Sequence, residues 1–178
     1  MHAVVLCPGP SLRRYLAAPV GADLTIGVNR AAEAVRCDWL AAIDCGIVSH
    51  MKIKGNPALF TSSKTWGRAL AEGAAPSRFC EVLSHEEIRF TTTCPASPGW
   101  KVFSITTALV LAEFLQATEI ELFGADWNGI ADWDRTIPPN ATQTRSPNRW
   151  SAERHKFDHV LKWLERDCGI QVSQHRNN

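Results

Sequence analysis

The chain has 178 residues, of which 45% are hydrophobic and 21% charged, and its formal net charge is +1. This length predicts a single domain, residues 1–178, with a sizeable core. The near-neutral charge gives little support to a nucleic-acid partner, which stays open only as an acceptor. No apolar run approaches the roughly 18 residues that a membrane helix needs, so we expect no membrane span.

Six cysteines occur, at positions 7, 37, 45, 80, 94 and 168, and no two of them form a C-x-x-C pair. The apolar stretch near the N-terminus is too short for a signal peptide. Both features favour a cytoplasmic protein with reduced thiols over a secreted disulfide framework.

Apolar runs that end in glycine or polar residues predict the elements of the first half. Strands are expected over residues 3–7, 23–29, 39–44 and 59–61, and helical segments over residues 12–16, 30–35 and 64–72. Residues 79–100 combine β-type residues with two prolines, which indicates short strands and loops.

The second half begins with Ser104, which can cap a helix over residues 105–115. That helix is apolar nearly all round, so it should pack against a sheet. A strand over 119–123 follows, then a proline-containing stretch, 128–150, that we interpret as a long loop or lid. Ser151 is expected to cap a helix that ends near residue 167, and a last strand covers 170–172. Alternating strands and helices predict an α/β, Rossmann-like domain, with a mostly parallel open sheet and helices on both faces.

The first strand runs directly into a turn of Gly9, Pro10 and Ser11. Such a turn can leave backbone N–H groups pointing at a phosphate bound at a helix N-terminus. The alternative is a plain strand-to-helix turn with Ser11 as the N-cap. Neither the G-x-G-x-x-G fingerprint nor the P-loop pattern is present, which disfavours common dehydrogenase and kinase scaffolds.

Other predicted strands also end in candidate ligand groups: Asn29, Asp44, and Gly124 with Asp126. Because ligands bind beyond the carboxyl ends of parallel strands, these groups should converge on one edge of the sheet. Asn29 can bind a base, a ribose or a phosphate, or simply end its strand. Asp44 and Asp126 can bind ribose hydroxyls, or magnesium with phosphates, and Asp126 can instead cap a turn.

Thr106 and Thr107 lie in the first turn of the buried helix, where free N–H groups can meet a ligand or simply start the helix. His155 is the preferred candidate for proton transfer, although it also fits a surface histidine on an amphipathic helix. His50 and His85 are alternatives in poorer contexts. The loop and the following helix are rich in side chains that suit sugars, bases or phosphates: Trp127, Trp133, Arg135, Arg145, Arg149, Trp150 and Arg154.

Four segments occur in a familiar order: Cys7-Pro8-Gly9-Pro10-Ser11-Leu12, Ile26-Gly27-Val28-Asn29, Ile43-Asp44, and Thr106-Thr107 followed by Glu119 to Trp127. As a set, this order resembles the superfamily of bacterial sialyltransferases, motility accessory factors and archaeal-type hydroxymethylpterin pyrophosphokinases. The compact length suits a minimal or phage-type member.

The sialyltransferase branch implies a Rossmann-like domain that binds a cytidine-monophosphate sugar without a metal. The Gly-Pro-Ser turn and Asn29 would approach the nucleotide, and His155 is the position to which the histidine base is carried. The pyrophosphokinase branch implies ATP and magnesium, with Asp44 and Asp126 as metal ligands.

These observations favour a glycosyltransferase-like enzyme that uses a nucleotide-sugar donor and an unknown hydroxyl acceptor, with no further cofactor. Gly9, Pro10, Ser11 and Asn29 would hold the nucleotide, while Asp44 and Asp126 contact ribose or sugar. A magnesium-dependent diphosphate transfer to a small alcohol is the second hypothesis. A nucleotide-binding module without catalysis is the third.

Overall fold

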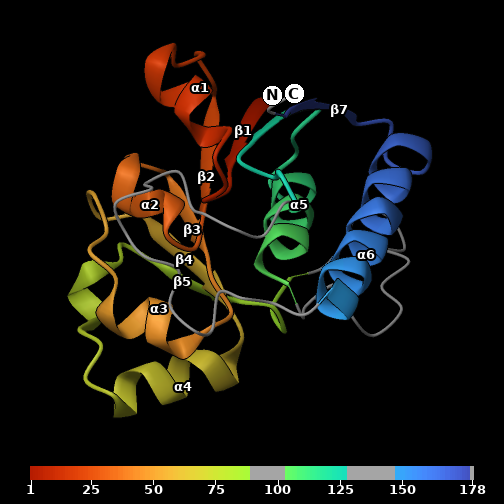
Figure 1. Cartoon of the computed structure of the whole chain (residues 1–178). Helices are drawn as coiled ribbons and strands as arrows, with labels where there is room; N and C mark the ends of the chain where they lie inside the picture. The colour runs from red at the N-terminus through yellow and green to blue at the C-terminus, as the bar shows by residue number, and fades with distance from the viewer. Residues whose placement is uncertain (89–102, 128–146, 177–178) are drawn as a thin grey trace.

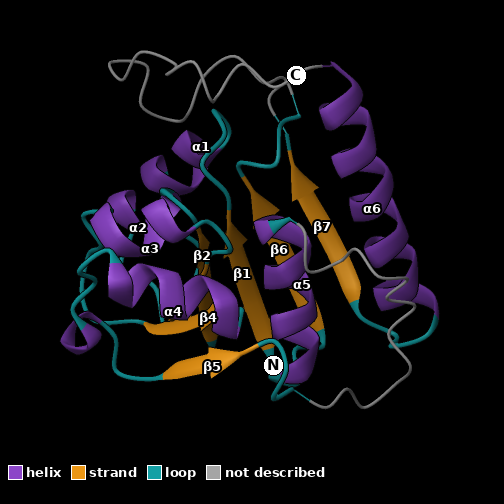
Figure 2. Cartoon of the chain, turned by 90° about the horizontal axis from the view of Figure 1, so that it is seen from below, coloured by secondary structure: helices purple, strands orange, loops and turns teal. Residues whose placement is uncertain are grey.

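The computed structural model describes residues 1–88, 103–127 and 147–176. Its centre is a seven-stranded sheet in the order β5-β4-β3-β2-β1-β6-β7, and every neighbouring pair is parallel (Figure 2). The strands are β1 His2–Leu6, β2 Leu24–Val28, β3 Trp39–Ala41, β4 Ala58–Thr61, β5 Val82–Ser84, β6 Glu119–Phe123 and β7 Gln171–His175. The predicted α/β, Rossmann-like fold is confirmed.

Helices cover both faces of the sheet (Figure 1). One face carries α1 Leu12–Ala17, α2 Ala31–Ala34, α3 Cys45–His50 and α4 Ser63–Ala71. The other carries α5 Ser104–Phe114 and α6 Pro147–Arg166. A 3-10 turn, η1 Pro76–Arg78, precedes β5.

The strand order changes direction between β1 and β6. From β1 to β5 the chain adds strands on one side of β1, and β6 and β7 then lie on its other side. Right-handed crossovers require the helices to change face at this point, which is the arrangement observed. The helices that follow β1 and β6 therefore lie on opposite faces of the sheet, and ligands bind at such a switch point.

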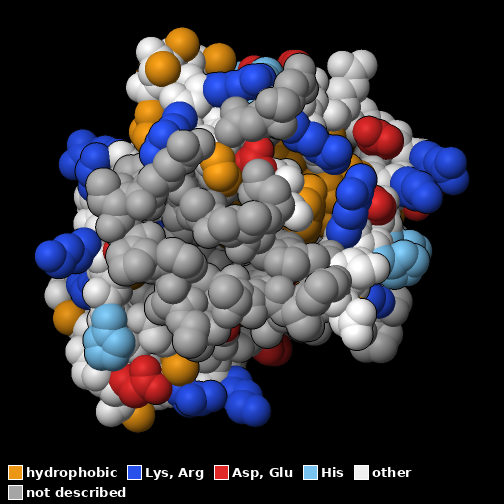
Figure 3. Space-filling model, in the orientation of Figure 1, with side chains coloured by type: hydrophobic (Ala, Val, Ile, Leu, Met, Phe, Trp, Pro, Cys, Tyr) orange, Lys and Arg blue, Asp and Glu red, His pale blue; other side chains and the backbone are white. Residues whose placement is uncertain are grey.

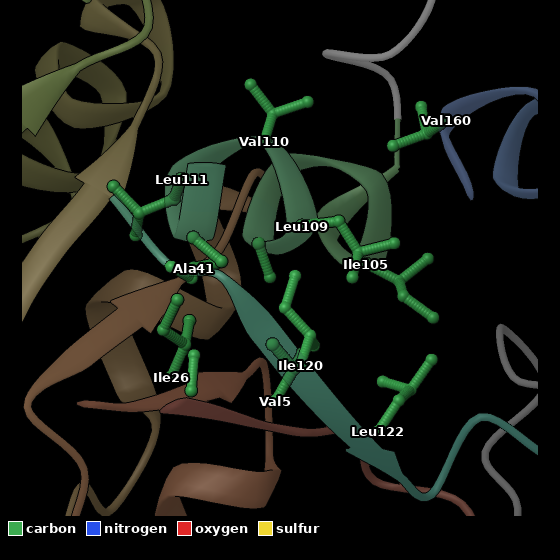
Figure 4. Close-up of a cluster of buried hydrophobic side chains, with 14 of the residues drawn as sticks. Val5, Ile26, Ala41, Ile105, Leu109, Val110, Leu111, Ile120, Leu122 and Val160 are labelled. Atoms are coloured by element: carbon green, nitrogen blue, oxygen red, sulfur yellow. The ribbon is translucent and has the colours of Figure 1, made fainter. Parts of the chain in front are cut away.

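The helix α5 forms the centre of the largest core cluster. Its residues from Ser104 to Glu113 are all buried, because the sheet covers one side of the helix and α6 contributes Phe157 and Val160 to the same cluster. Figure 4 shows Ile105 on the side of Leu122 and Leu109 on the side of Ile120. The helix thus runs antiparallel to β6, and its N-terminus lies at the carboxyl edge of the strands.

Two helix starts differ from the prediction. Pro147 begins α6, so the expected loop does not extend to residue 150, and Ser151 lies inside the helix rather than at its N-cap. Proline suits the first helical position because the missing N–H is not needed there. Phe103, and not Ser104, is the N-cap of α5. Residues 128–146, the rest of the predicted lid, lie outside the described residues.

A further helix, α3, was not predicted. Its sequence contains Gly46 and the β-branched pair Ile47 and Val48, which lowers helix propensity. Val48 is completely buried against the core formed by β3, β4 and α4, so tertiary packing overrides local preference. None of the described helices combines the length and apolar character needed to cross a membrane.

Candidate functional site

The loops that follow β1 and β6 are joined along the backbone at the switch point. Cys7 N–H donates to the carbonyl of Phe123 at 2.8 Å, and Gly9 N–H donates to the carbonyl of Gly124 at 2.9 Å. A Cβ on Gly9 would lie 2.3 Å from the Gly124 carbonyl oxygen, and one on Gly124 would lie 1.9 Å from the Cys7 carbonyl oxygen. Gly124 also has φ +77°. Only glycines permit this approach of two backbones.

Side chains reinforce the same junction. Ser11 N–H donates to Asp126 Oδ2 at 2.7 Å, and Gly124 N–H donates to Ser11 Oγ at 2.8 Å. The structure therefore brings together four predicted site residues, Gly9 and Ser11 from one loop and Gly124 and Asp126 from another more than 100 positions later in the chain. Ser11 occupies the N-cap position of α1, but its side chain does not cap that helix; the carboxylate of Asp126 performs this role instead.

The backbone N–H groups of the Gly-Pro-Ser turn are all used within the protein. Besides those of Gly9 and Ser11, the N–H groups of Leu12, Arg13 and Arg14 donate to the carbonyls of Gly9, Pro10 and Ser11. The turn thus offers no free backbone N–H group in this structure, because the β6 loop supplies a carbonyl and a carboxylate as acceptors. The expectation that Gly9, Pro10 and Ser11 hold a phosphate stays a prediction.

Asn29 lies at the end of β2, next to β1. Its φ is +49°, a left-handed conformation that asparagine tolerates better than most residues. Its backbone N–H donates to Ala41 O at 3.1 Å. Its side-chain Oδ1 is buried and accepts no hydrogen bond from the residues that the structure describes. A ligand donor could satisfy this amide oxygen.

The start of α5 lies at the same edge. Thr106 and Thr107 are fully buried, and their hydroxyls donate to the carbonyl of Phe103 at 2.8 and 3.0 Å. These hydroxyls therefore stabilise the first turn of α5 and do not point out of the protein. The N-cap residue, Phe103, makes no side-chain capping bond, and the positive end of the helix dipole is directed at this edge.

Asp44 is exposed and lies at the N-cap of α3. It follows β3, whereas Asp126 follows β6, and two strands lie between them. Such strands are about 14 Å apart, while magnesium holds its ligands at roughly 2 Å. The arrangement does not support a single magnesium ion shared by Asp44 and Asp126. Among the described residues, no three His, Cys, Asp or Glu side chains form a group that could hold a metal ion.

The predicted base, His155, is exposed on α6. Two residues earlier, Glu153 is only 7% exposed, a burial that sequence reasoning did not predict. Burial raises the pKa of the Cys7 thiol, and the negative charges of Glu153 and then Asp126 raise that pKa further. Both carboxylates therefore act on the end of β1, which makes the switch point acidic.

The remaining candidates are two histidines and the Trp- and Arg-rich segment. His50 is exposed at the end of α3, and His85 is buried after β5, with its ring 4.6 Å from that of Phe60. Trp127 is half-buried against Phe157, and Arg154 is exposed. The structure describes neither residues 133–145 nor the side chains of Arg149 and Trp150.

On the face shown in Figure 3, the described lysine and arginine side chains lie at several separate places.

The fold is similar to that of a solved structure, the sialyltransferase CST-II in complex with a trisaccharide acceptor and CMP. The TM-score is 0.53 at 12% sequence identity, and the match covers 98% of this chain and 80% of that chain. At this identity, the similarity shows a shared fold alone. No protein-family model matches the sequence, and no curated protein matches it.

Proposed function

We propose that the chain transfers a sugar from a nucleotide-activated donor to a hydroxyl group of an acceptor. The observation that carries this proposal is the junction of Gly9, Ser11, Gly124 and Asp126 at the switch point, with the unsatisfied amide oxygen of Asn29 on the next strand. Ligands of doubly wound sheets bind at this place. Similarity in fold to a sialyltransferase solved with CMP and an acceptor supports the choice of reaction.

Charge suggests how such a donor would lie. Asp126 and Glu153 make the end of β1 acidic, so a phosphate is repelled there, whereas sugar hydroxyls can donate to carboxylates. The positive end of α5 attracts an anion. We therefore place the nucleotide on the side of Asn29 and α5, and the sugar and acceptor on the side of the two carboxylates.

Thermal unfolding with nucleotides tests the proposal. Cytidine, uridine, guanosine and adenosine mono- and diphosphates should be compared, each in EDTA and in magnesium. We expect cytidine monophosphate to raise Tm most, in a saturable manner and equally in EDTA and in magnesium. A ligand that binds the folded state at 100 times its Kd stabilises that state by about 2.7 kcal/mol, which is enough to raise Tm measurably. Release of nucleotide from CMP-, UDP- and GDP-sugars then tests transfer.

Asn29→Gly tests the role of the Asn29 side chain in nucleotide binding, because glycine adopts the same left-handed backbone conformation but lacks the amide group. Loss of one hydrogen bond should weaken nucleotide binding by roughly 5- to 20-fold. Gln116→Gly is the matched control, since Gln116 also has positive φ, +68°, but lies beyond the opposite end of α5. Its nucleotide affinity should equal that of the parent protein.

The outcomes separate the hypotheses. A stabilisation that requires magnesium would contradict metal-free sugar transfer and favour diphosphate transfer. Nucleotide binding without release of nucleotide from any sugar donor would favour a non-catalytic binding module. The absence of any stabilisation by any nucleotide would overturn the proposal.

A further inference from the structure

Two histidines lie one turn apart on the solvent side of α6. His155 and His159 are both exposed, whereas Phe157, halfway between them, is fully buried. Successive residues of a helix are about 100° apart, so each histidine points about 200° away from the direction in which Phe157 enters the core. The two histidines are therefore neighbours on one exposed strip of the helix, with Cβ atoms about 5–6 Å apart.

The protein itself does not use either imidazole. Among the residues that the structure describes, neither ring makes a hydrogen bond, an ion pair or an aromatic contact. His50 differs from this pair, because it ends α3 and the residue one turn before it is Gly46. The ring nitrogens of His155 and His159 are consequently available to a ligand from solution.

The surroundings of the pair leave room for such a ligand. Side chains of a helix lean towards its N-terminus, so His159 leans over His155, and His155 leans over Ser151. Ser151 is short and exposed, which leaves the space beyond both rings open. Asp158 is partly exposed and Lys162 is exposed, so the pair has one charged neighbour of each sign at a spacing of three residues.

We propose that His155 and His159 bind a divalent transition-metal ion of the zinc or copper class. Two histidines at this helical spacing present their rings on one face and can hold a single ion. Imidazole nitrogen is a preferred ligand of zinc, copper and nickel. The two rings fill two coordination positions and water fills the others, in keeping with the lack of a three-residue metal group among the described residues.

This metal site is separate from the site of the proposed sugar transfer. Phe157 faces the loop after β6, where its ring centroid lies 4.8 Å from that of Trp127. The two histidines point to the opposite side of α6. An ion held there links two successive turns of the helix and stabilises the folded chain by mass action.

Zinc titration of the full-length chain tests the site. Calorimetry in the presence of a phosphine reductant measures the affinity, and NMR signals of the histidine rings locate the ion. The parent is compared with His155→Gln and His159→Gln. His50→Gln is the matched control, since it removes an exposed histidine without a second one a turn before it. Magnesium is the control ion, because it prefers oxygen ligands.

Zinc should shift the ring signals of His155 and His159 together, and copper should bind more tightly than zinc. Each of the two variants should lower the zinc affinity at least about 10-fold, because the remaining ring then binds the ion without a linked second ligand. His50→Gln should keep the parental affinity, and magnesium should not bind there. Lys162→His adds a third imidazole to the strip and should tighten zinc binding.

Parental zinc affinity in both His155→Gln and His159→Gln would overturn the site, and so would ring signals that do not respond to zinc. An equal loss in His50→Gln would also overturn it, since the helical spacing would then not matter. Both substituted positions are exposed, and a parental Tm without metal shows that each variant is folded. Nucleotide release is not measured, so a chain that transfers no sugar would overturn the proposed function and leave this site standing.

Discussion

The carboxylate of Asp126 accepts a hydrogen bond from the backbone N–H of Ser11 at 2.7 Å. A residue after the sixth strand thus caps the helix that follows the first strand. This bond stabilises the β1 turn, and it also uses the donor that a phosphate would otherwise take. The site is consequently a rigid junction with acidic character at β1 and β6, and its anion-attracting groups lie towards β2 and α5.

Gly124 should tolerate no side chain. Gly124→Ala places a Cβ 1.9 Å from the Cys7 carbonyl oxygen at φ +77°, so we expect the free energy of unfolding to fall by more than about 3 kcal/mol. Urea denaturation measures this change. Gly67→Ala in α4, where no atom lies within 4 Å of the added Cβ, should instead stabilise by about 0.5–1 kcal/mol. Equal stability of both variants would contradict the close approach of the two loops.

Removing the cap of α1 should be costly. Asp126→Ala leaves the Ser11 N–H without its acceptor, and we expect a loss of about 1–3 kcal/mol in urea denaturation. Asp44→Ala is the control, because Asp44 also occupies an N-cap position but makes no side-chain capping bond. The free energy of unfolding of Asp44→Ala should stay within about 0.5 kcal/mol of the parent value. If Asp44→Ala lost as much stability as Asp126→Ala, the hydrogen bond to the Ser11 N–H would not be the cause of the loss.

The position of Ser151 within α6 predicts the sign of the stability change when this residue is replaced. Ser151 is exposed within the helix that begins at Pro147, so Ser151→Ala should be neutral or stabilise by up to about 0.5 kcal/mol through helix propensity. An N-cap serine would instead cost about 1 kcal/mol on replacement. Chemical denaturation distinguishes the two, and destabilisation would place the helix start at Ser151 after all.

Alkaline pH should destabilise the fold through buried thiols. Burial, and then the charge of Asp38, raise the pKa of Cys37 from 9.0 to about 12. Between these values the unfolded chain loses the proton while the folded chain keeps it. The stability contributed by this thiol is therefore complete below pH 9 and is lost as pH rises towards 12, by about 1.4 kcal/mol per pH unit.

Unfolding free energies measured from pH 8 to 11 check this sign. Cys37→Ala should reduce the downward slope, whatever its effect on absolute stability. Cys80→Ala, which removes an exposed thiol, should keep the parental slope. An unchanged slope in Cys37→Ala would argue against a buried, protonated Cys37.

Strands were predictable because apolar runs followed by glycine or polar residues mark buried parallel strands. The helix α3 could not be predicted, because Gly46 and Ile47 disfavour a helix locally and burial of Val48 stabilises it. Pro147 did carry a helix-start signal, but its polar surroundings favoured a loop.

The convergence of Ser11 and Asp126 followed from the rule that parallel strands end at one edge. The direct hydrogen bond between Ser11 and Asp126 could not be predicted from that rule, because it depends on the close approach of Gly9 to Gly124. Glu153 lies two residues before the chosen base, and its spacing of four residues from Phe157 was the available signal of its burial. Only the contact of Phe157 with Trp127 shows which way that face points.

The pairing of β1 with β6 also has a consequence for how the protein is made. Ser11 leaves the ribosome 115 residues before Asp126, and at about 5–20 residues per second that interval lasts many seconds. Throughout it, the nascent chain already contains the whole Gly-Pro-Ser turn but lacks the loop that fixes its shape. A translation product that ends before β6 would therefore contain the Gly-Pro-Ser turn without the hydrogen bonds with Gly124 and Asp126 that fix its conformation.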